Sequence, residues 1–339
     1  MGCDRADRID DGKLLTLSVR VQHWPIRGNF TIARGSKTEA VVVLAEISDG
    51  KSTGRGECVP YARYGESVDG VVAAIERLRS ELGRGLDRIG LEKLLPPGAA
   101  RNAADCALWD LQAKQSGQPA AERAGLAPLK PVLTAFTISL GMPDTMAAQA
   151  REASAHPLLK LKLGGDGDAD RMRAVRDAVP DARLIVDANE AWGPEKVRPL
   201  LAVAAETGIE LVEQPLPVDG DAILAEIAHE VPICADESAH DSASLEQIID
   251  RYDAVNIKLD KTGGLTEALR MSDRARTEGL KIMAGCMVAT SLAMAPAMLV
   301  AQTADWVDLD GPLLLARDRD AALAYENGDV YPPSPALWG

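Results

Sequence analysis

Six charged residues stand at the ends of short apolar segments in the middle of the chain, and their types suit proton transfer beside a metal ion. The segments are LLKLKLG at 158–164, RLIVDAN at 183–189, IELVEQP at 209–215, VPICADES at 231–238 and AVNIKLD at 254–260. The charged residues are Lys160, Lys162, Asp187, Glu213, Asp236 and Lys258. Carboxylates in the middle of this run, with lysines on both sides, form the pattern of a metal site held between two bases.

Lys160 and Lys162 lie two residues apart, so on a strand their side chains share one face and the flanking leucines share the other. In an isolated strand such lysines are more often exposed residues of an amphipathic surface. In a parallel barrel the outer face is covered by helices and takes the leucines, so the lysines turn inward. Two neighbouring ammonium groups repel each other, and we expect this repulsion to favour the neutral form that a general base requires.

Asp187, Glu213 and Asp236 end three successive segments. A single carboxylate at a strand end usually caps the following helix, but three at one barrel mouth would repel one another without a cation. Ligands that are all oxygen favour a hard cation, so we expect Mg²⁺, with Mn²⁺ as the alternative. Such a cation would polarise a substrate carboxylate and stabilise the dianion formed when its α-proton leaves.

Lys258 ends a segment that lies across the expected barrel from Lys162. A base on each side of one carbon permits removal of a proton from one face and its return to the other face. This arrangement inverts a stereocentre. A lyase needs only one of the two lysines as a base, with the other acting electrostatically.

The elements that position these residues follow a regular repeat. Apolar, β-rich runs begin near residues 132, 158, 183, 210, 232, 254, 281 and 306. Helical patterns lie between them, for example at 169–179, 196–207, 245–252 and 265–278. The repeat predicts an α/β fold, a (β/α)7β TIM-like barrel with its chemistry at the carboxyl ends of the strands. An open, doubly wound sheet is the alternative, but no GxGxxG motif follows the first strand.

The first part of the chain has a different pattern. EAVVVLAEI at 39–47 predicts a strand, whereas 24–38, rich in Gly, Pro and basic residues, predicts a loop. Helical spacing covers 66–82 and 99–116. We therefore expect a small N-terminal α+β domain. The expected domains are this N-terminal domain at 1–125, the barrel with the catalytic residues at 126–312, and a segment at 313–339 that returns to the N-terminal domain.

Composition excludes several classes of partner. The chain has 339 residues, and its formal net charge of −14 argues against nucleic acid or an anionic membrane as a partner.

The five cysteines are scattered and contain no CxxC pair, so we expect a reducing, cytoplasmic setting. The first dozen residues lack the apolar core of a signal peptide. The apolar stretch at 287–300 is too short and too interrupted to span a bilayer, and predicts a buried helix.

The segments KLKLG, DAN, VEQP, ADES and NIKLDKTGG, in this order and spacing, resemble the enolase superfamily, specifically its muconate lactonising enzyme subgroup. The resemblance implies a capping α+β domain over a (β/α)7β barrel, and a lysine base with Mg²⁺ that stabilises an enediolate. It implies that Mg²⁺ is bound by Asp187, Glu213 and Asp236. It also implies that Lys162 and Lys258 are the acid/base pair and that Lys160 tunes Lys162.

Asp308 and Asp310, in WVDLDGP, share one face at the end of the last strand. A strand-end turn is the alternative explanation, since Asp-Gly is a common turn pair, but at the mouth of an anionic site two more carboxylates call for a cationic substrate group. This DxD pair is similar to that of the dipeptide epimerases, where it binds the substrate's N-terminal ammonium. Arg34, in FTIARGSKTEA, matches the position expected to hold an anionic side chain, for which Arg is well suited. Arg27 and Lys37 are alternatives, and any of the three could be solvated instead.

The stretch ECVPYARYGES at 57–67 resembles the L-Ala-D/L-Glu epimerases. The resemblance implies a Mg-dependent dipeptide epimerase that inverts the α-carbon of the C-terminal residue by two-base 1,1-proton transfer through an enediolate. The alternatives are a muconate cycloisomerase or o-succinylbenzoate synthase-type lyase, and a non-catalytic barrel that only binds a peptide. The exact dipeptide, the lysine that serves each epimer, and whether the chain forms a homo-oligomer stay open.

Overall fold

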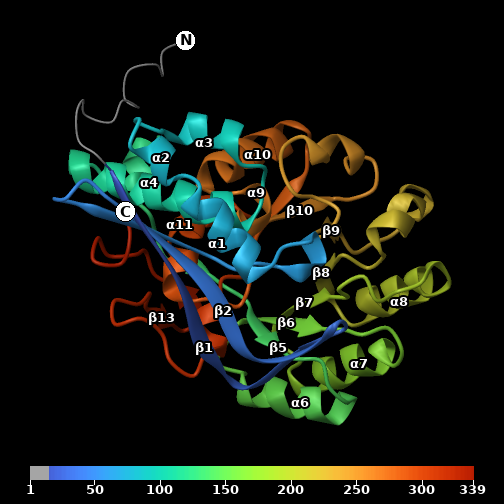
Figure 1. Cartoon of the computed structure of the whole chain (residues 1–339). Helices are drawn as coiled ribbons and strands as arrows, with labels where there is room; N and C mark the ends of the chain where they lie inside the picture. Colours follow the sequence, from blue (N-terminus) through green and yellow to red (C-terminus); the bar gives the residue numbers. More distant parts are fainter. Residues whose placement is uncertain (1–14) are drawn as a thin grey trace.

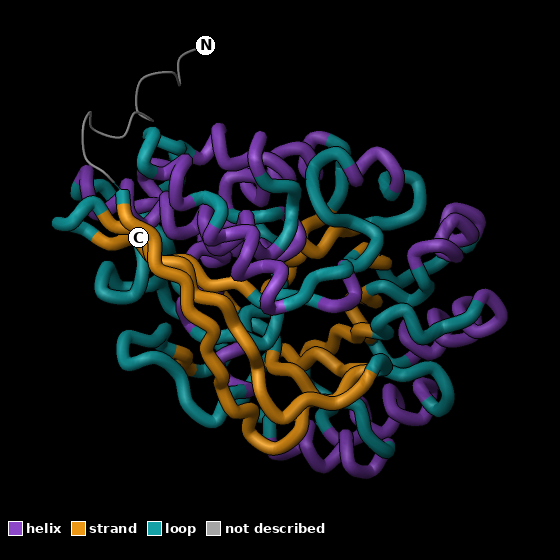
Figure 2. The backbone as a smooth tube through the Cα atoms, in the orientation of Figure 1, coloured by secondary structure: helices purple, strands orange, loops and turns teal. Residues whose placement is uncertain are grey.

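The structure, a computed structural model, describes residues 15–339. Its N-terminal part is built on a three-stranded antiparallel sheet in the order β1-β2-β3. The strands are β1 (Thr16–Ile32), β2 (Gly35–Ser48) and β3 (Thr53–Cys58). β1 and β2 form one long hairpin that runs diagonally across the molecule, from the helices of this part to the barrel strands (Figure 1, Figure 2).

The expected loop at 24–38 is wrong, because nearly all of this segment belongs to the hairpin. Trp24 pairs with Ala40 and Phe30 pairs with Lys37, with a shift of register between them. Most side chains in this half of the hairpin are exposed or half-buried. No apolar alternation therefore marks the strands in the sequence, and the glycines and basic residues resemble a loop.

Helices pack on one side of this sheet. They are α1 (Val68–Glu76), α2 (Arg79–Leu82), α3 (Arg88–Leu94), α4 (Ala99–Ser116) and α5 (Ala120–Arg123). The predicted helix at 99–116 is confirmed, and the one predicted at 66–82 is divided into α1 and α2. Gly54 and Gly56 of β3 let α4 approach closely, because a Cβ atom at either would lie 2.0 Å from a carbonyl oxygen of that helix.

The second part is a curled parallel sheet of eight strands that follow one another in chain order. The strands are β5 (Phe136–Ile138), β6 (Leu158–Lys162), β7 (Arg183–Asp187), β8 (Ile209–Glu213), β9 (Ile233–Ala235), β10 (Ala254–Ile257), β11 (Lys281–Ala284) and β12 (Trp306–Val307). The backbone N–H of Ala135 donates to the carbonyl of Val307 over 2.8 Å, so the two edges of the sheet meet. The predicted parallel barrel and the predicted N-terminal α+β fold are confirmed.

Helices cover the outside of this sheet, as α6, α7 and α8 do beside β5, β6 and β7 in Figure 1. The α-helices are α6 (Pro143–Glu152), α7 (Asp168–Ala178), α8 (Pro194–Glu206), α9 (Leu259–Thr262), α10 (Leu265–Thr277), α11 (Ser291–Ala301) and α12 (Gly311–Leu314). The crossovers after β8 and β9 instead contain the 3₁₀ segments η2 (Val218–Glu226) and η3 (Ser244–Gln247). The helix expected at 245–252 is therefore wrong in type and extent, because the β-branched Ile248 and Ile249 favour helix weakly.

The first barrel strand begins later than the predicted start near residue 132. Val132–Leu133 forms β4, which pairs with β14 (Asp329–Val330) in a small sheet that also contains β13 (Tyr325–Glu326). The first barrel strand, β5, begins four residues after the start of β4. The run VLTAFTISL is apolar almost throughout, so the sequence does not mark where one strand ends and the next begins.

A closed apolar layer fills the bottom of the barrel. It takes one residue from each strand or from the residue just before it, namely Ala135, Leu158, Ile185, Leu211, Cys234, Ala254, Met283 and Trp306. Leu158 shares its face of β6 with Lys160 and Lys162. The inward face of this strand therefore passes from the apolar floor to charged groups at the mouth, while Leu159 and Leu161 face the outer helices.

The last segment of the chain contacts the N-terminal part. Trp338 donates its indole N–H to the carbonyl of Cys106 over 3.0 Å, and the backbone N–H of Gly339 donates to Asp110 over 2.8 Å. Both acceptors belong to α4. The expectation for the first dozen residues lies outside the described part of the chain.

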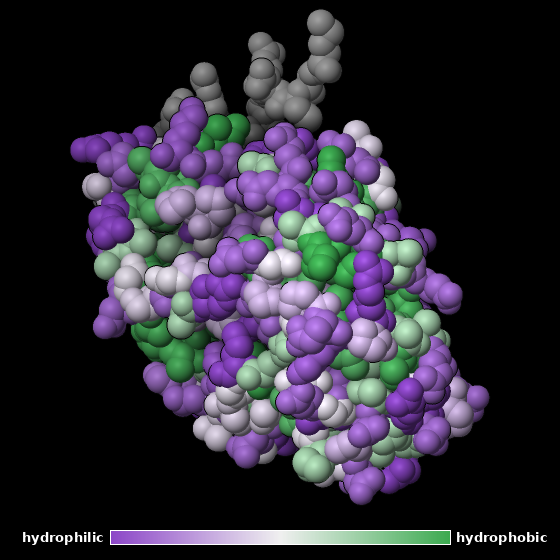
Figure 3. Space-filling model, turned by 90° about the vertical axis from the view of Figure 1, so that its right-hand side faces the viewer, coloured by the Kyte–Doolittle hydropathy of each residue, from purple (hydrophilic) through white to green (hydrophobic). Residues whose placement is uncertain are grey.

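The apolar stretch at 287–300 contributes α11, which is buried along almost its whole length. Within residues 15–339, no helix has the length and apolar character needed to cross a membrane. On the face shown in Figure 3, polar and charged residues surround small apolar patches.

Candidate active site

The two lysines of β6 point into the barrel mouth and contact carboxylates there. Lys160 is buried, and its Nζ lies 2.6 Å from Glu213 Oε2, 2.7 Å from Asp308 Oδ2 and 3.4 Å from Asp187 Oδ2. Lys162 Nζ lies 2.6 Å from Asp187 Oδ2. Because alternate side chains of a strand share one face, both lysines lie on the inner face, as the sequence pattern predicts for a parallel barrel.

Three carboxylates follow on successive strands. Asp187 ends β7 and pairs in register with Glu213, which ends β8; Asp236 directly follows β9. All three side chains are at most 2% exposed. Within residues 15–339, no three acidic, His or Cys side chains are already arranged around one point as a metal site would be. The carboxylates turn instead toward lysine ammonium groups.

Lys258 completes this cluster from the opposite wall. It follows β10, four strands from β6 in the eight-stranded sheet. Its Nζ lies 2.6 Å from Asp236 Oδ2 and 3.8 Å from Glu213 Oε1. We name the cluster of six predicted residues the lysine–carboxylate centre. Its members are Lys160, Lys162, Asp187, Glu213, Asp236 and Lys258.

The electrostatics of the centre differ from the expectation for Lys160. Burial alone would lower the pKa of this lysine, but Asp308, Glu213 and Asp187 raise it well above its ordinary value. At Lys160, the attraction of these carboxylates therefore outweighs the expected repulsion between the two lysines. Burial and the charge of Asp187 raise the pKa of Glu213. At Asp187, burial acts to raise the pKa, but the positive charges of Lys162 and Lys160 outweigh this effect and lower the pKa to about 2.

A cavity of about 1040 Å³ lies between the hairpin, the loop after β3 and the barrel mouth. Lys162 and Lys258 both line it, from opposite sides of the barrel. The ring of Phe30, on the hairpin, lies 5.8 Å from Lys162 Nζ. The two predicted bases therefore face one shared cavity, and both side chains are buried.

The two aspartates at the end of the barrel also line this cavity. Asp308 uses Oδ2 for Lys160, whereas its buried Oδ1 has no hydrogen-bond partner among the described residues. Asp310 accepts a hydrogen bond of 2.6 Å from the backbone N–H of Thr137. Burial and the charge of Asp308 raise the pKa of Asp310 to about 7. An unpaired buried carboxylate oxygen at a cavity wall requires a hydrogen-bond donor.

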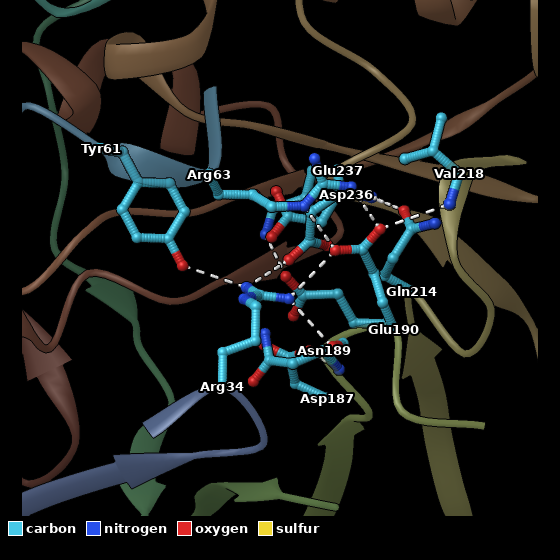
Figure 4. Close-up of polar contacts among 12 residues, drawn as sticks. Arg34, Tyr61, Arg63, Asp187, Asn189, Glu190, Gln214, Val218, Asp236 and Glu237 are labelled. Carbon is cyan, nitrogen blue, oxygen red and sulfur yellow. Dashed lines mark hydrogen bonds and ion pairs between the residues drawn. The ribbon is translucent and has the colours of Figure 1, made fainter. Parts of the chain in front are cut away.

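Arg34 lies at the tip of the hairpin and is engaged by the barrel. It donates to Glu237 over 2.6 Å, to the carbonyl of Asn189 over 2.9 Å, and to Glu190 over 3.2 Å (Figure 4). It also donates to the hydroxyl of Tyr61 over 3.0 Å. These four acceptors take four of the five N–H donors of its guanidinium.

Arg63 adds a two-pronged contact from the loop after β3. It donates to the two oxygens of Glu190 over 2.9 and 2.7 Å. We name Arg34, Tyr61, Arg63, Glu190 and Glu237 the arginine cluster. Of these residues only Arg34 was predicted from the sequence. Glu190 directly follows the DAN motif and Glu237 lies within ADES, so their positions at strand ends could have identified them.

The other two basic candidates occupy different environments. Lys37 lines the cavity, lies 5.5 Å from the centroid of the Tyr61 ring, and pairs with no carboxylate in the described part of the chain. Burial, together with the charge of Arg34, lowers the pKa of Lys37. Arg27, by contrast, does not line the cavity.

Three further side chains hold the carboxylates from behind. Asn256 donates to Glu213 Oε1 over 2.7 Å. Gln214 accepts from the backbone N–H of Asp236 over 2.8 Å. Lys261 donates to Asp236. These residues lie inside the quoted motifs, but no role was predicted for them. Asn256 could have been found because it shares a strand face with Lys258.

A parallel barrel with a capped mouth, whose strand ends hold carboxylates between two lysines, is an enolase-type architecture. Residues 14–125 match the sequence model of the mandelate racemase / muconate lactonizing enzyme N-terminal domain. Residues 145–336 match the enolase C-terminal domain-like model. The chain belongs to the mandelate racemase / muconate lactonizing enzyme family of the enolase superfamily.

Named relatives share most of their length with this chain. L-Ala-D/L-Glu epimerase from Escherichia coli (strain K12) is 46% identical over 319 residues, which cover 93% of this chain and 99% of that protein. N-acetyl-D-glutamate racemase from Pseudoalteromonas sp is 42% identical over 300 residues, covering 88% of this chain and 95% of that protein.

Solved structures are also similar to this chain over nearly its whole length. One is an enolase family member from Agrobacterium tumefaciens with homology to dipeptide epimerases, with bound sodium and L-Ala-L-Glu. It is 55% identical, has a TM-score of 0.95, and covers 96% of this chain and 100% of its own. A dipeptide epimerase from Cytophaga hutchinsonii, complexed with Mg and D-Ala-L-Val, is 27% identical with a TM-score of 0.88 and covers 94% of both chains.

Proposed function

We propose that this protein is a Mg²⁺-dependent dipeptide epimerase that inverts the α-carbon of the C-terminal residue of L-Ala-D/L-Glu or a close dipeptide. The observation that carries the proposal is the placement of Lys162 and Lys258 on opposite walls of one cavity, with three carboxylates between them. The names of the relatives and the dipeptides bound in the solved structures support it.

The residues of the centre fit a hard divalent cation. The negative charges of Asp187 and Asp236 both act to raise the pKa of Glu213, so the three carboxylates lie close together. Glu213 Oε2 accepts no well-aligned hydrogen bond from the described residues and has only an ion-pair contact with Lys160. These three carboxylates would hold Mg²⁺, with Mn²⁺ as the alternative. When bound, the cation supplies positive charge to the carboxylate of the substrate and so stabilises the enediolate.

The two lysines do the proton transfer. The neutral member of the pair takes the α-proton from one face of the carbon, and the protonated member returns a proton to the other face. In the reverse direction Lys162 and Lys258 exchange these roles. Lys160 is held among three carboxylates and does not line the cavity. We assign it a fixed positive charge beside Lys162 rather than a transferred proton.

Asp308 and Asp310 would bind the N-terminal ammonium of the dipeptide. The free Oδ1 of Asp308 offers an acceptor at the cavity wall, and Asp310 adds a carboxyl group beside it. This assignment disfavours muconate and succinylbenzoate as substrates, because diacids without an ammonium would meet two acidic groups. It therefore separates an epimerase from the cycloisomerase and lyase alternatives.

The side-chain carboxylate of the substrate would meet Lys37. Arg34 was the first candidate, but four acceptors already take four of its five N–H donors. Lys37 pairs with no carboxylate among residues 15–339 and faces the same cavity. We propose that Lys37 makes the direct contact while Arg34 keeps the hairpin tip over the barrel mouth.

A second candidate is the epimerisation of an N-acylated glutamate, favoured by the similarity to N-acetyl-D-glutamate racemase. The proton transfer would be the same, but an N-acetyl group carries no ammonium for Asp308 to bind. The two candidates therefore differ in the substrate group that Asp308 and Asp310 would meet: an ammonium group in the dipeptide and an N-acetyl group in the other substrate.

The test is proton exchange in D₂O with Mg²⁺, followed by mass spectrometry. L-Ala-L-Glu is expected to gain deuterium at the α-carbon of glutamate and to yield L-Ala-D-Glu. N-acetyl-L-glutamate and muconate are the comparison substrates. Exchange of N-acetyl-L-glutamate alone would select the second candidate. Turnover of a diacid alone would select a cycloisomerase, and no reaction across a dipeptide panel would favour a peptide-binding barrel.

The proposal includes the organisation of the chain. Residues 1–125 would form the capping domain, 126–312 the catalytic barrel, and 313–339 a segment that returns to the cap. The contacts of Trp338 and Gly339 with α4 support the last part. We still predict a cytoplasmic location, the absence of nucleic-acid and membrane partners, and a possible homo-oligomer. The free cysteines Cys58, Cys106, Cys234 and Cys286 are consistent with a reducing compartment.

A further inference from the structure

Lys261 is a buried lysine directly behind the barrel mouth. It lies in α9, three residues after Lys258, and its side chain is 0% exposed. Unlike Lys258, it is not among the residues that line the cavity. A lysine ammonium is seldom buried completely unless it is paired. It also cannot reach a substrate from this position, so its role must act through its neighbours.

Its three donors have three acceptors. Lys261 Nζ donates to Asp236 Oδ1 over 2.6 Å, to the carbonyl of Asp236 over 2.6 Å, and to the carbonyl of Asn256 over 2.9 Å. An ammonium group has three N–H bonds, so its donor capacity is filled. The contacts join the end of β9, at Asp236, to β10, at Asn256.

The contacts divide the two oxygens of Asp236 between two lysines. Lys261 holds Oδ1 from behind, while Oδ2 faces Lys258 at 2.6 Å and the cavity. Lys261 also donates to the backbone carbonyl of Asp236. It therefore fixes the position of the strand end and the orientation of the Asp236 carboxylate. Without it, Oδ1 would lose the donor that holds it, and the carbonyl of Asp236 would keep only the backbone N–H of Ala239, at 3.1 Å.

We propose that Lys261 is a positioning residue that presents Asp236 to the divalent cation. The inference rests on the proposed Mg²⁺ site and extends it to a residue that touches neither metal nor substrate. Groups that orient a metal ligand from behind commonly change metal affinity by about 10–100-fold when they are removed.

Charge alone predicts the opposite effect. An ammonium near a cation opposes cation binding, so removal of Lys261 would strengthen Mg²⁺ binding if only its charge mattered. If its geometry matters, removal weakens binding, because Asp236 can turn both oxygens toward Lys258. The sign of the change in affinity therefore separates the two roles.

The experiment measures Mg²⁺ affinity without substrate, by calorimetry and by the Mg²⁺-dependent rise in melting temperature. Lys261→Met keeps the aliphatic stem and removes the donors. It is expected to weaken Mg²⁺ binding about 10–100-fold. Unchanged or tighter binding would overturn the proposal.

Lys114→Met is the matched control. Lys114 also bridges a buried aspartate and a backbone carbonyl, with distances of 2.7 Å to Asp110 Oδ2 and 3.0 Å to the carbonyl of Thr53. It lies in α4, away from the cavity. This variant is expected to lower the melting temperature while leaving the Mg²⁺ affinity unchanged.

Lys261→Arg keeps the charge but cannot place three donors on the same converging acceptors. It is expected to weaken Mg²⁺ binding too, and it provides the test if Lys261→Met does not fold. Wild-type affinity in this variant would show that charge suffices and would overturn the proposal.

A double variant links the effect to its target. In an Asp236→Asn background, Lys261→Met is expected to cause little further loss of Mg²⁺ affinity, because the group that Lys261 positions is already altered. Fully additive losses would overturn the link. If the wild-type protein itself binds no Mg²⁺, the proposed metal site fails, and that outcome is distinct from a failure of Lys261 alone.

Discussion

The lysine–carboxylate centre and the arginine cluster are both built from opposite charges, but they are held in different ways. The centre stands on the ends of barrel strands, and its side chains are at most 10% exposed. The arginine cluster joins a hairpin tip and a loop to the barrel, and its two arginines are 27% and 39% exposed. Breaking a buried pair leaves an uncompensated charge, whereas an exposed pair contributes little.

The difference suggests a division of roles. The strands fix the groups that need exact placement for proton transfer, whereas the more exposed cluster holds a cover that substrates must pass. Substitutions in the centre should therefore remove activity, and substitutions in the arginine cluster should mainly alter KM.

Removal of the metal is the largest perturbation expected. Chelation by EDTA should reduce epimerisation of L-Ala-L-Glu to background, because nothing else would stabilise the enediolate carboxylate. Added Mg²⁺ should restore the rate, and Mn²⁺ should restore part of it. Activity that survives exhaustive chelation would contradict the assignment of Asp187, Glu213 and Asp236.

Replacement of either base should come next. Lys162→Ala and Lys258→Ala are each expected to reduce epimerisation by about 10²–10⁴-fold, because each removes the acid or base on one face. Each variant should still exchange the α-proton of one epimer in D₂O, and the two variants should retain opposite epimers. Loss of exchange with the same epimer in both would contradict a two-base mechanism.

The contact between cap and barrel at Asp260 offers a stability test. Its carboxyl accepts hydrogen bonds from the backbone of Val59 and from Asn102, and burial raises its pKa from 3.8 to about 7. The folded state therefore holds a proton that the unfolded state releases, so this group makes stability fall as pH rises from about 4 to about 7.

Asp260→Asn can accept the same hydrogen bonds without ionising. It is expected to raise stability relative to the wild type at pH 8, by at most about 4 kcal/mol, and to have little effect at pH 4. Denaturant unfolding at both pH values measures the difference. A gain that is equal at both pH values would show that ionisation of Asp260 is not the cause.

Lys37→Met should change specificity more than catalysis. If Lys37 contacts the side-chain carboxylate of the substrate, kcat/KM for L-Ala-L-Glu should fall about 10-fold or more, whereas L-Ala-L-Val should be unaffected. Arg27→Met is the control, since Arg27 lies on the same hairpin but outside the cavity. Equal losses with both dipeptides would indicate a structural effect.

The smallest effect is expected in the arginine cluster. Glu190→Gln weakens the contacts with Arg34 and Arg63, and should raise KM about 2–5-fold with little change in kcat. The wild-type KM should rise with ionic strength more steeply than that of the variant. Glu206→Gln, which disrupts a similar pair with Arg173 on the outer surface, should leave KM unchanged. A large fall in kcat for Glu190→Gln would remove the distinction between the two regions.

Much of the centre was predictable because strand periodicity determines which side chains share a face. Lys160 and Lys162 turn inward because Leu159 and Leu161 must face the helices. Motifs separated by similar intervals place Asp187 and Glu213 on neighbouring strands. The hairpin at 24–38 was not predictable in this way, since both of its faces are largely exposed and impose no apolar pattern.

The sequence by itself determined the repeat, the inward face of each strand, and therefore the residues that gather at the barrel mouth. Only the tertiary structure decided that Arg34 meets Glu190 and Glu237, that no carboxylate of the described residues pairs with Lys37, and that Lys261 holds Asp236. The reason is physical: periodicity records which way a side chain points relative to its own element. Partners brought together from separate loops and helices depend on how those elements pack, which no local pattern encodes.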